Sequence, residues 1–225
     1  MNTRDRHCDF CDEFSGGVNN AFATRYQGRP TDRTVLQTSR FMVVPSLGQL
    51  VEGHLLIIPK QHGCALADLP PDALGELVRL KTTLVKAIRS HYGTCVLFEH
   101  GARTETSGGC GISHAHLHVV PLPAEKDPRA LLEVSFRHHR VNGIADLASI
   151  EKDCPYLYYE DASGGSRVLY PAFLPSQYMR RVLAKALGNQ NWDWRNSGRE
   201  EAVLVTRERA WAILAEAGTT ELCAK

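Results

Sequence analysis

The stretch His114-Ala115-His116-Leu117-His118-Val119-Val120-Pro121 carries the most information in this chain. Three histidines alternate with apolar residues and run into a β-branched pair. This pattern is typical of a β-strand, because alternate residues of a strand face the same side of the sheet. We therefore expect three imidazoles in a row on one face and apolar side chains on the other. Imidazole is the side chain most readily used as a base, nucleophile or metal ligand near neutral pH.

Each histidine taken alone has an ordinary interpretation. A single buried histidine is most often a core residue whose two ring nitrogens are hydrogen-bonded. Three histidines in strict alternation are hard to satisfy in that way. Because histidine-rich segments also bind metals, the remainder of the chain has to separate a metal-binding tract from a catalytic row.

The composition is that of an ordinary globular protein. The 225 residues suffice for one large domain or one domain with a substantial extension, and 43% are hydrophobic. The formal net charge of +1 gives no overall attraction to nucleic acid or to membrane surfaces. No apolar run approaches the ~20 residues of a membrane helix, and the polar first ten residues lack a signal-peptide core. With seven cysteines, these features predict a cytoplasmic protein with reduced thiols.

The first half of the chain has the pattern of an α+β domain. Apolar runs bounded by turn residues predict strands before the histidine strand, and a helical repeat of apolar residues predicts a helix over 72–90. Short connections favour antiparallel pairing. We expect a catalytic domain over 1–125, with an antiparallel sheet of about five strands and a packed helix; the expected earlier strands are 34–38, 40–45, 55–58 and 95–98.

Residues 126–225 have the pattern of a C-terminal α/β extension packed on the first domain. The runs 156–159 and 167–170 flank Gly164-Gly165 and predict a hairpin. Ser176 is the expected N-cap of a helix that ends before Gly188. Residues 200–217 are expected to form a last helix.

Two further segments, with the histidine stretch, make the chain resemble the histidine triad family of nucleotide-binding proteins. They are Cys8-Asp9-Phe10-Cys11 and Gly53-His54-Leu55-Leu56-Ile57-Ile58-Pro59-Lys60-Gln61-His62. The order and spacing of all three agree with the family over residues 7–123. The family includes hydrolases and phosphorylases of dinucleoside polyphosphates and galactose-1-phosphate uridylyltransferase-like enzymes. The resemblance therefore implies a histidine triad-like sheet and nucleotidyl transfer.

The resemblance also implies catalytic roles. His116 would attack an α-phosphate and form a covalent nucleotidyl-histidine, which requires a neutral imidazole. His118, on the same face, would contact the phosphate or protonate the leaving group. The backbone amides of Gly109 and Gly111 would approach the phosphate, because glycine has no Cβ in the way. The alternative for these glycines is a flexible turn before the strand.

A structural zinc ion is the cofactor that the sequence suggests. Cys8 and Cys11 have the spacing of a zinc ligand pair. In some branches of the family, two such cysteines join histidines at the positions of His62 and His114. Four nitrogen and sulfur ligands would make a closed Zn²⁺ site. The alternative is that His114 only orients His116 and that the cysteines are free thiols.

The chain departs from the family pattern at positions expected to bind substrate. Family members often carry an acidic residue before the Gly-His strand, and Ser46 is the nearest polar residue here. Where an asparagine is common, this chain has Glu99 and His100, either of which is a candidate for substrate contact. A carboxylate beside a phosphate would repel it unless it were paired or protonated.

The extension offers further candidates. Gln177 and Arg180 lie at the start of the expected capped helix, where a helix N-terminus and an arginine favour an anion. Trp192 and Trp194 are candidates for stacking on a base or sugar, with a place in the core as the ordinary alternative. The basic run 137–140 is expected to be a solvated loop.

The leading hypothesis is a nucleotide hydrolase, phosphorylase or nucleotidyltransferase that acts at an α-phosphate through His116. Its partner would be a nucleotide or dinucleotide, and a homodimer is common in the family. One alternative is a non-catalytic, zinc-stabilised nucleotide-binding protein, although a binding module has no need of a nucleophile. Another is a factor that processes nucleic-acid ends, which the near-neutral charge disfavours.

Overall fold

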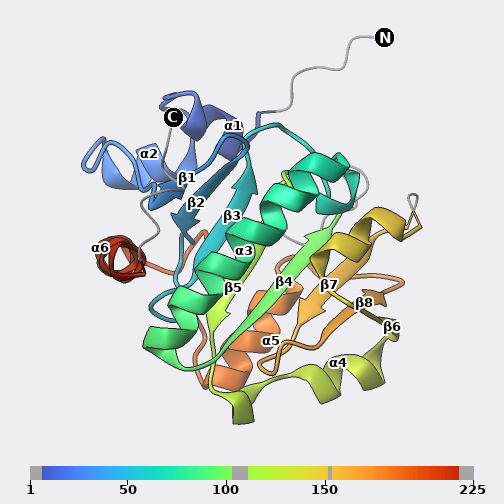
Figure 1. Cartoon of the computed structure of the whole chain (residues 1–225). Helices are drawn as coiled ribbons and strands as arrows, with labels where there is room; N and C mark the ends of the chain where they lie inside the picture. Colours follow the sequence, from blue (N-terminus) through green and yellow to red (C-terminus); the bar gives the residue numbers. More distant parts are fainter. Residues whose placement is uncertain (1–6, 103–110, 152–153, 218–225) are drawn as a thin grey trace.

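One antiparallel sheet of eight strands forms the centre of the fold (Figure 1). The computed structural model describes residues 7–102, 111–151 and 154–217. The strand order is β1-β2-β3-β5-β4-β7-β8-β6, and every neighbouring pair is antiparallel. The strands are β1 (Leu36–Gln37), β2 (Phe41–Pro45), β3 (Leu55–Pro59), β4 (Cys95–Gly101), β5 (Leu117–Pro121), β6 (Arg137–Val141), β7 (Tyr156–Glu160) and β8 (Ser166–Tyr170).

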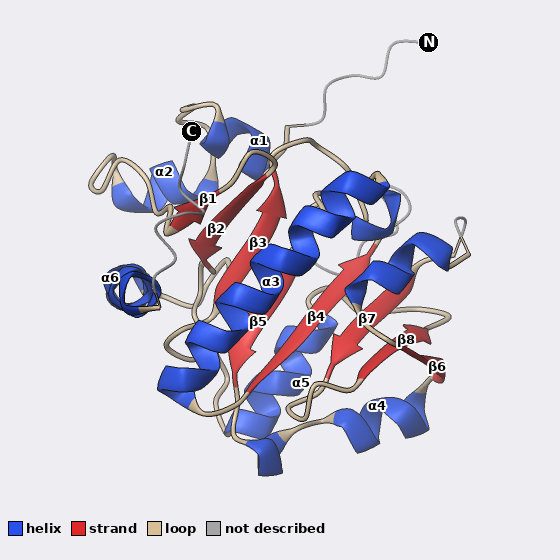
Figure 2. Ribbon diagram, viewed as in Figure 1, coloured by secondary structure: helices blue, strands red, loops and turns tan. Residues whose placement is uncertain are grey.

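Helices cover both faces of this sheet (Figure 2). The long helix α3 lies across one face and α5 lies against the other, each over its own apolar core. Among the described residues, no helix is both long and apolar enough to cross a bilayer. The helices are α1 (Asp9–Phe14), α2 (Ala21–Tyr26), α3 (Pro71–Tyr92), α4 (Arg129–Ser135), α5 (Tyr178–Leu187) and α6 (Glu200–Glu216), with short 3₁₀ helices η1 (Leu66–Asp68), η2 (Ala124–Lys126) and η3 (Ile144–Ser149).

The histidine stretch has the two-sided pattern that the sequence predicts. Ala115, Leu117 and Val119 join the core beneath α3. His116 and His118 face the α5 side, with their ring centroids 4.8 Å apart. The regular strand begins only at Leu117, so the first two histidines precede it but keep its alternation.

The predicted α+β fold with an antiparallel sheet and a packed helix is confirmed, but the sheet is larger than the expected five strands. The extension adds β6, β7 and β8 to the same sheet, because β7 pairs with β4 along its whole length. This pairing satisfies the outer edge of β4, whose residues are all buried. An open backbone edge at the centre of the molecule would otherwise remain exposed.

Two local predictions in the extension are wrong. The helix α5 begins at Tyr178, and Gln177 rather than Ser176 occupies its N-cap position, in a left-handed conformation with φ of 59°. The basic run 137–140 belongs to the edge strand β6 rather than to a loop. Charged residues at a sheet edge disfavour pairing with another chain, which explains why this strand has no apolar face that a sequence pattern could reveal.

Candidate active site and metal centre

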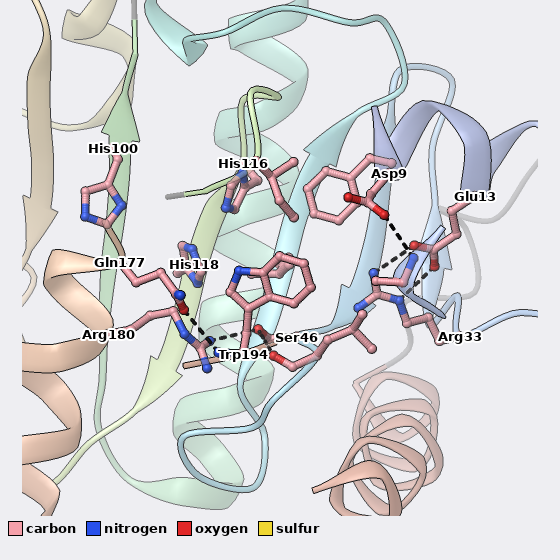
Figure 3. Close-up of a pocket in the computed structure, with 15 residues that line it drawn as sticks. Asp9, Glu13, Arg33, Ser46, His100, His116, His118, Gln177, Arg180 and Trp194 are labelled. Carbon is pink, nitrogen blue, oxygen red and sulfur yellow. Dashed lines mark hydrogen bonds and ion pairs between the residues drawn. The ribbon is translucent and has the colours of Figure 1, made fainter. Parts of the chain in front are cut away.

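A pocket lies on the α5 side of the sheet, where three parts of the chain meet (Figure 3). The strands β3, β4 and β5 form its floor, the N-terminal helices form one wall, and the extension forms the other. The residues that line the pocket are up to 185 positions apart in the sequence, from Asp9 to Trp194. The residues that line it are Asp9, Phe10, Glu13, Ala21, Arg33, Ser46, Leu47, Leu56, His100, Ile112, His116, His118, Gln177, Arg180 and Trp194.

The tautomer of His116 is set by its own backbone. Its Nδ1 lies 2.6 Å from the carbonyl oxygen of His114, which can only accept a hydrogen bond, so Nδ1 carries the proton. The lone pair is then on Nε2. The pKa of His116 is lowered to about 4, chiefly by burial and also by the positive charge of Arg180. The hydrogen bond to His114 raises the pKa and offsets only part of this effect. The side chain is therefore a neutral imidazole at pH 7, as a nucleophile must be.

His118 is held by a second buried histidine, His54. The Nδ1 atom of His118 lies 2.9 Å from Nε2 of His54, and Phe98 stacks on the His118 ring with centroids 4.1 Å apart. The other nitrogen of His54 is buried without a hydrogen-bond partner. A buried N–H without a partner is rarer than a buried acceptor without one, so His54 donates from Nε2 and His118 keeps its own proton on Nε2.

His100 lines the same pocket from β4. The backbone N–H of Met179, in the first turn of α5, donates to its Nε2 over 3.3 Å. Burial lowers the pKa of His100 to about 3, which keeps the ring neutral. The strand alternation that places His100 in the pocket turns its neighbour away from it.

That neighbour is Glu99, and the structure does not place it in the pocket. It is fully buried on the α3 side, where it accepts hydrogen bonds from the backbone N–H of Leu66 and the hydroxyl of Tyr156, both over 2.6 Å. Consecutive residues of a strand face opposite sides, so only one of Glu99 and His100 can face the substrate. Of the two candidates, the structure therefore places His100 and not Glu99 among the residues that line the pocket.

Three other predicted residues come together in the pocket. Arg180 donates to the Ser46 hydroxyl over 3.3 Å, and to the backbone carbonyls of Trp192 and Gly48. Gln177 also lines the pocket and binds the loop after α5, by accepting from the Trp194 N–H over 3.1 Å. The contacts of Arg180 with Ser46 and Gly48 attach the extension to the loop that follows β2.

The predicted phosphate-binding glycines do not line this pocket in the described residues. Gly109 lies outside the described residues. Gly111 instead borders a second cavity beside Cys8 and His62, and its carbonyl accepts from Arg195 over 2.6 Å. Its φ of +79° requires a residue without a Cβ, which gives this glycine a conformational role.

Four predicted ligands meet in one cluster: Cys8, Cys11, His62 and His114. Their ligand atoms all lie within 4.8 Å of one another. Nδ1 of His114 is 3.3 Å from the Cys8 sulfur, and Nδ1 of His62 is 3.4 Å from the Cys11 sulfur. Zinc bonds of about 2.0–2.3 Å in a tetrahedron place neighbouring ligand atoms about 3.4–3.8 Å apart, so the cluster fits such an ion.

Two details of the cluster favour a cation. Nε2 of His114 donates to the Pro59 carbonyl over 2.8 Å, which leaves the Nδ1 lone pair facing the thiols. A buried partner of this kind is typical of histidines that bind metals. Burial and the neighbouring Cys8 raise the pKa of the Cys11 thiol to about 11; a bound cation would reverse that and stabilise both thiolates.

Sequence reasoning missed three features of the pocket. The first is His54, which contacts His118; its position in the Gly53–His62 segment was the signal that could have found it. The other two are Glu13 and Arg33, which form a bidentate ion pair in the pocket wall with N–O distances of 2.7 and 2.9 Å. They are 20 residues apart and belong to no motif, so the pair could be found only from the fold.

Comparison with known proteins identifies the class of fold. Residues 34–137 match a family profile described as "Protein similar to CwfJ C-terminal". The chain is 26% identical over 179 residues to mouse CWF19-like protein 1, which covers 72% of this chain and 32% of the relative. It is 26% identical over 90 residues to an uncharacterized HIT-like protein of Mycobacterium tuberculosis, which covers 39% of this chain and 60% of the relative.

Two further comparisons extend this list. The chain is 35% identical over 75 residues to the adenosine 5'-monophosphoramidase HNT1 of Saccharomyces cerevisiae, covering 33% of this chain and 44% of the relative. A crystal structure of a hypothetical histidine triad nucleotide-binding protein from Sulfolobus tokodaii aligns over 93% of both chains, with 16% identity and a TM-score of 0.45. The chain spans only about a third of the mouse relative and less than two thirds of the other two relatives.

The matches and the triad together define the class. The chain has a histidine triad superfamily fold with a C-terminal extension. The extension supplies three of the fifteen residues that line the pocket: Gln177, Arg180 and Trp194.

The hydrogen-bond geometry predicts the proton positions on two triad histidines. At pH 7, His116 is expected to be protonated on Nδ1 and His118 on Nε2. Two-dimensional ¹H–¹⁵N NMR of histidine-labelled protein distinguishes these tautomers, and His116→Gln and His118→Gln variants would assign the signals. A His116 signal of the Nε2–H type, or a charged ring at pH 7, would contradict the assignment.

Proposed function

We propose that the chain breaks a bond at the α-phosphate of a nucleotide through His116 and a transient nucleotidyl-histidine. The observation that supports this most strongly is the 2.6 Å contact between Nδ1 of His116 and the His114 carbonyl, which assigns the lone pair to Nε2 of a histidine that lines the pocket. The yeast relative is named an adenosine 5'-monophosphoramidase, and cleavage of a bond at a nucleotide phosphate is consistent with that name.

The chemistry would proceed in two displacements. Nε2 of His116 attacks the α-phosphorus and forms a P–N bond, while the leaving group departs with its electron pair and takes a proton from water in the pocket. A water molecule then attacks the same phosphorus and loses a proton. The P–N bond breaks, and its electron pair returns to Nε2. The net reaction consumes one water and leaves His116 unchanged.

The surrounding groups would stabilise the charge that develops on the phosphoryl oxygens. His118 is neutral, because burial places its pKa well below the ordinary value, and so acts as a hydrogen-bond donor rather than as an acid. Arg180 adds a fixed positive charge at the same end of the pocket. Fixed donors and charges in a water-poor site are the largest contribution to many transfers of this kind.

The acceptor determines the reaction class, since water gives a hydrolase, phosphate a phosphorylase and a metabolite a transferase. Compatible donors are nucleoside phosphoramidates, dinucleoside polyphosphates and nucleotide sugars. A purely structural binding role would leave the buried, correctly protonated nucleophile without a purpose.

We expect a covalent adduct on His116. Brief incubation with adenosine and guanosine 5'-phosphoramidates or dinucleotides, followed by acid-free intact mass spectrometry, should show a gain of one nucleoside monophosphate. His116→Ala should abolish the adduct and reduce turnover by on the order of a thousandfold or more.

The matched control is His138→Ala, which removes an exposed histidine on the edge strand β6 and should leave turnover unchanged. Turnover that survives the loss of His116 would refute the covalent mechanism. Absence of turnover with every donor in the wild-type protein would favour the binding alternative.

We also propose that Cys8, Cys11, His62 and His114 hold one structural Zn²⁺. The four ligand types, the nitrogen–sulfur distances of 3.3 and 3.4 Å within the cluster and the hydrogen bond from His114 to Pro59 support this. When bound, the ion would fix the N-terminal helix α1 to the start of the histidine strand. With all four positions supplied by the protein, it would have no open position for substrate.

The zinc proposal predicts about one equivalent of metal per chain. Elemental analysis of protein purified without chelators should show this amount, and Cys11→Ser should lower it to near zero. Removal of the metal should also lower the free energy of unfolding, by about 3–4 kcal/mol when free zinc is 100 to 1,000 times its Kd. Cys154→Ser, at a half-buried thiol outside the cluster, is the control; full zinc content in Cys11→Ser would exclude the proposed ligands.

A further inference from the structure

The wall of the pocket on the α1 side contains a buried ion pair. Arg33 is 1% exposed, and its Nε and Nη2 atoms bind the two carboxylate oxygens of Glu13 over 2.7 and 2.9 Å. A third donor, Nη1, binds the Pro45 carbonyl. The guanidinium is thus held in one orientation beside the pocket, with five N–H groups of which these contacts use three.

A buried ion pair is a poor device for stability alone. Removing two charges from water costs several kcal/mol per ion, and apolar residues of the same volume often serve as well. The pair also lies in the wall of a ligand pocket. Buried charges that face a cleft are candidates for recognition.

Charges divide the pocket into two ends (Figure 3). Arg180 and the triad histidines lie at one end, and Asp9 and Glu13 lie at the other. Anionic phosphate is therefore favoured at the triad end. A second phosphate at the α1 end would face the carboxylates of Asp9 and Glu13, of which Arg33 offsets only one. The group that binds at the α1 end is expected to be neutral and rich in hydrogen-bond donors.

The walls between the two ends are apolar. Four apolar side chains are among the residues that line the pocket: Phe10, Leu47, Ile112 and Trp194. Apolar walls suit the faces of a flat ring, while fixed polar groups suit its edge. Sugar hydroxyls or a charged group would lose water against such walls without compensation.

We propose that Glu13 and Arg33 form a nucleobase subsite that selects bases with an exocyclic amino group. The amino N–H groups would donate to the Glu13 carboxylate, with Asp9 beside it, and Arg33 would donate to a ring nitrogen or carbonyl of the same edge. A base without the amino group offers fewer donors and turns a carbonyl oxygen toward the carboxylates. The inference rests on the proposed nucleotide substrate but not on the covalent step.

The test is equilibrium binding of product-like ligands by calorimetry. The probes are AMP and GMP, which carry an amino group, IMP, which lacks it, and ribose 5-phosphate, which lacks the base. Hydrogen bonds to charged groups are worth on the order of tenfold or more in affinity. We expect AMP or GMP to bind at least fivefold more tightly than IMP, and IMP to bind no more weakly than ribose 5-phosphate.

Glu13→Gln should reduce the ratio of the affinity for AMP or GMP to that for IMP to near one, while leaving the affinity for ribose 5-phosphate unchanged. The matched control is Glu76→Gln, which alters a Glu–Arg pair with Arg40 outside the pocket and should keep the wild-type ratio. The ratio of the affinity for AMP or GMP to that for IMP does not depend on the fraction of the protein that is folded. If Glu13→Gln does not fold, the comparison of ligands on the wild-type protein still tests the proposal.

Wild-type ratios below fivefold for both AMP and GMP, or a ratio that persists in Glu13→Gln, would overturn the proposal. The covalent mechanism has a separate readout. A nucleotide adduct with no base preference would retain the proposed function and remove this subsite. A base preference without any adduct would retain this subsite and remove the covalent mechanism.

Discussion

The hydrogen bond from Nδ1 of His116 to the carbonyl of His114 is the constraint on which the chemistry of this site depends. It joins two residues of the histidine stretch just before β5 and uses a backbone acceptor, so the assignment of the tautomer does not depend on a second side chain. The same two residues also connect the site to the cysteine cluster, because His114 directs Nδ1 toward the thiols and Nε2 toward Pro59. The proposed nucleophile and the proposed metal ligands therefore share one short segment of backbone.

The C-terminal extension supplies a further wall of the pocket. Its strand β7 pairs with β4, and α5 lies against the face of the sheet that carries His116 and His118. Arg180 and Gln177, at the start of α5, then reach the loop after β2 and the loop before α6. All the walls of the pocket thus come from a single chain, through contacts between segments more than a hundred residues apart.

The sequence was sufficient for the features that depend on local spacing. The alternation of three histidines determines which side chains share a face, and the spacing of Cys8 and Cys11 identifies a ligand pair. The sequence could not choose between Glu99 and His100. Consecutive strand residues face opposite sides of the sheet, and only the fold shows which side of β4 faces the pocket. The edge strand β6 was missed because charged residues on both faces erase the apolar alternation that identifies a strand.

Other features had no sequence signal at all. The pair of Glu13 and Arg33 joins α1 to the chain before β1, and only the tertiary fold brings the two together. Gln177 replaces Ser176 at the start of α5, because its amide group binds both Asp193 and Trp194. Tertiary contacts of this kind override local capping preferences.

The stereochemical course at the α-phosphorus tests the central claim most directly. A donor with a chiral α-phosphorothioate, hydrolysed in ¹⁸O-labelled water, reports how many displacements occur at phosphorus. Attack by His116 followed by attack by water gives two inversions, so the account predicts net retention of configuration. Net inversion would show a single direct attack by water and would contradict a nucleotidyl-histidine.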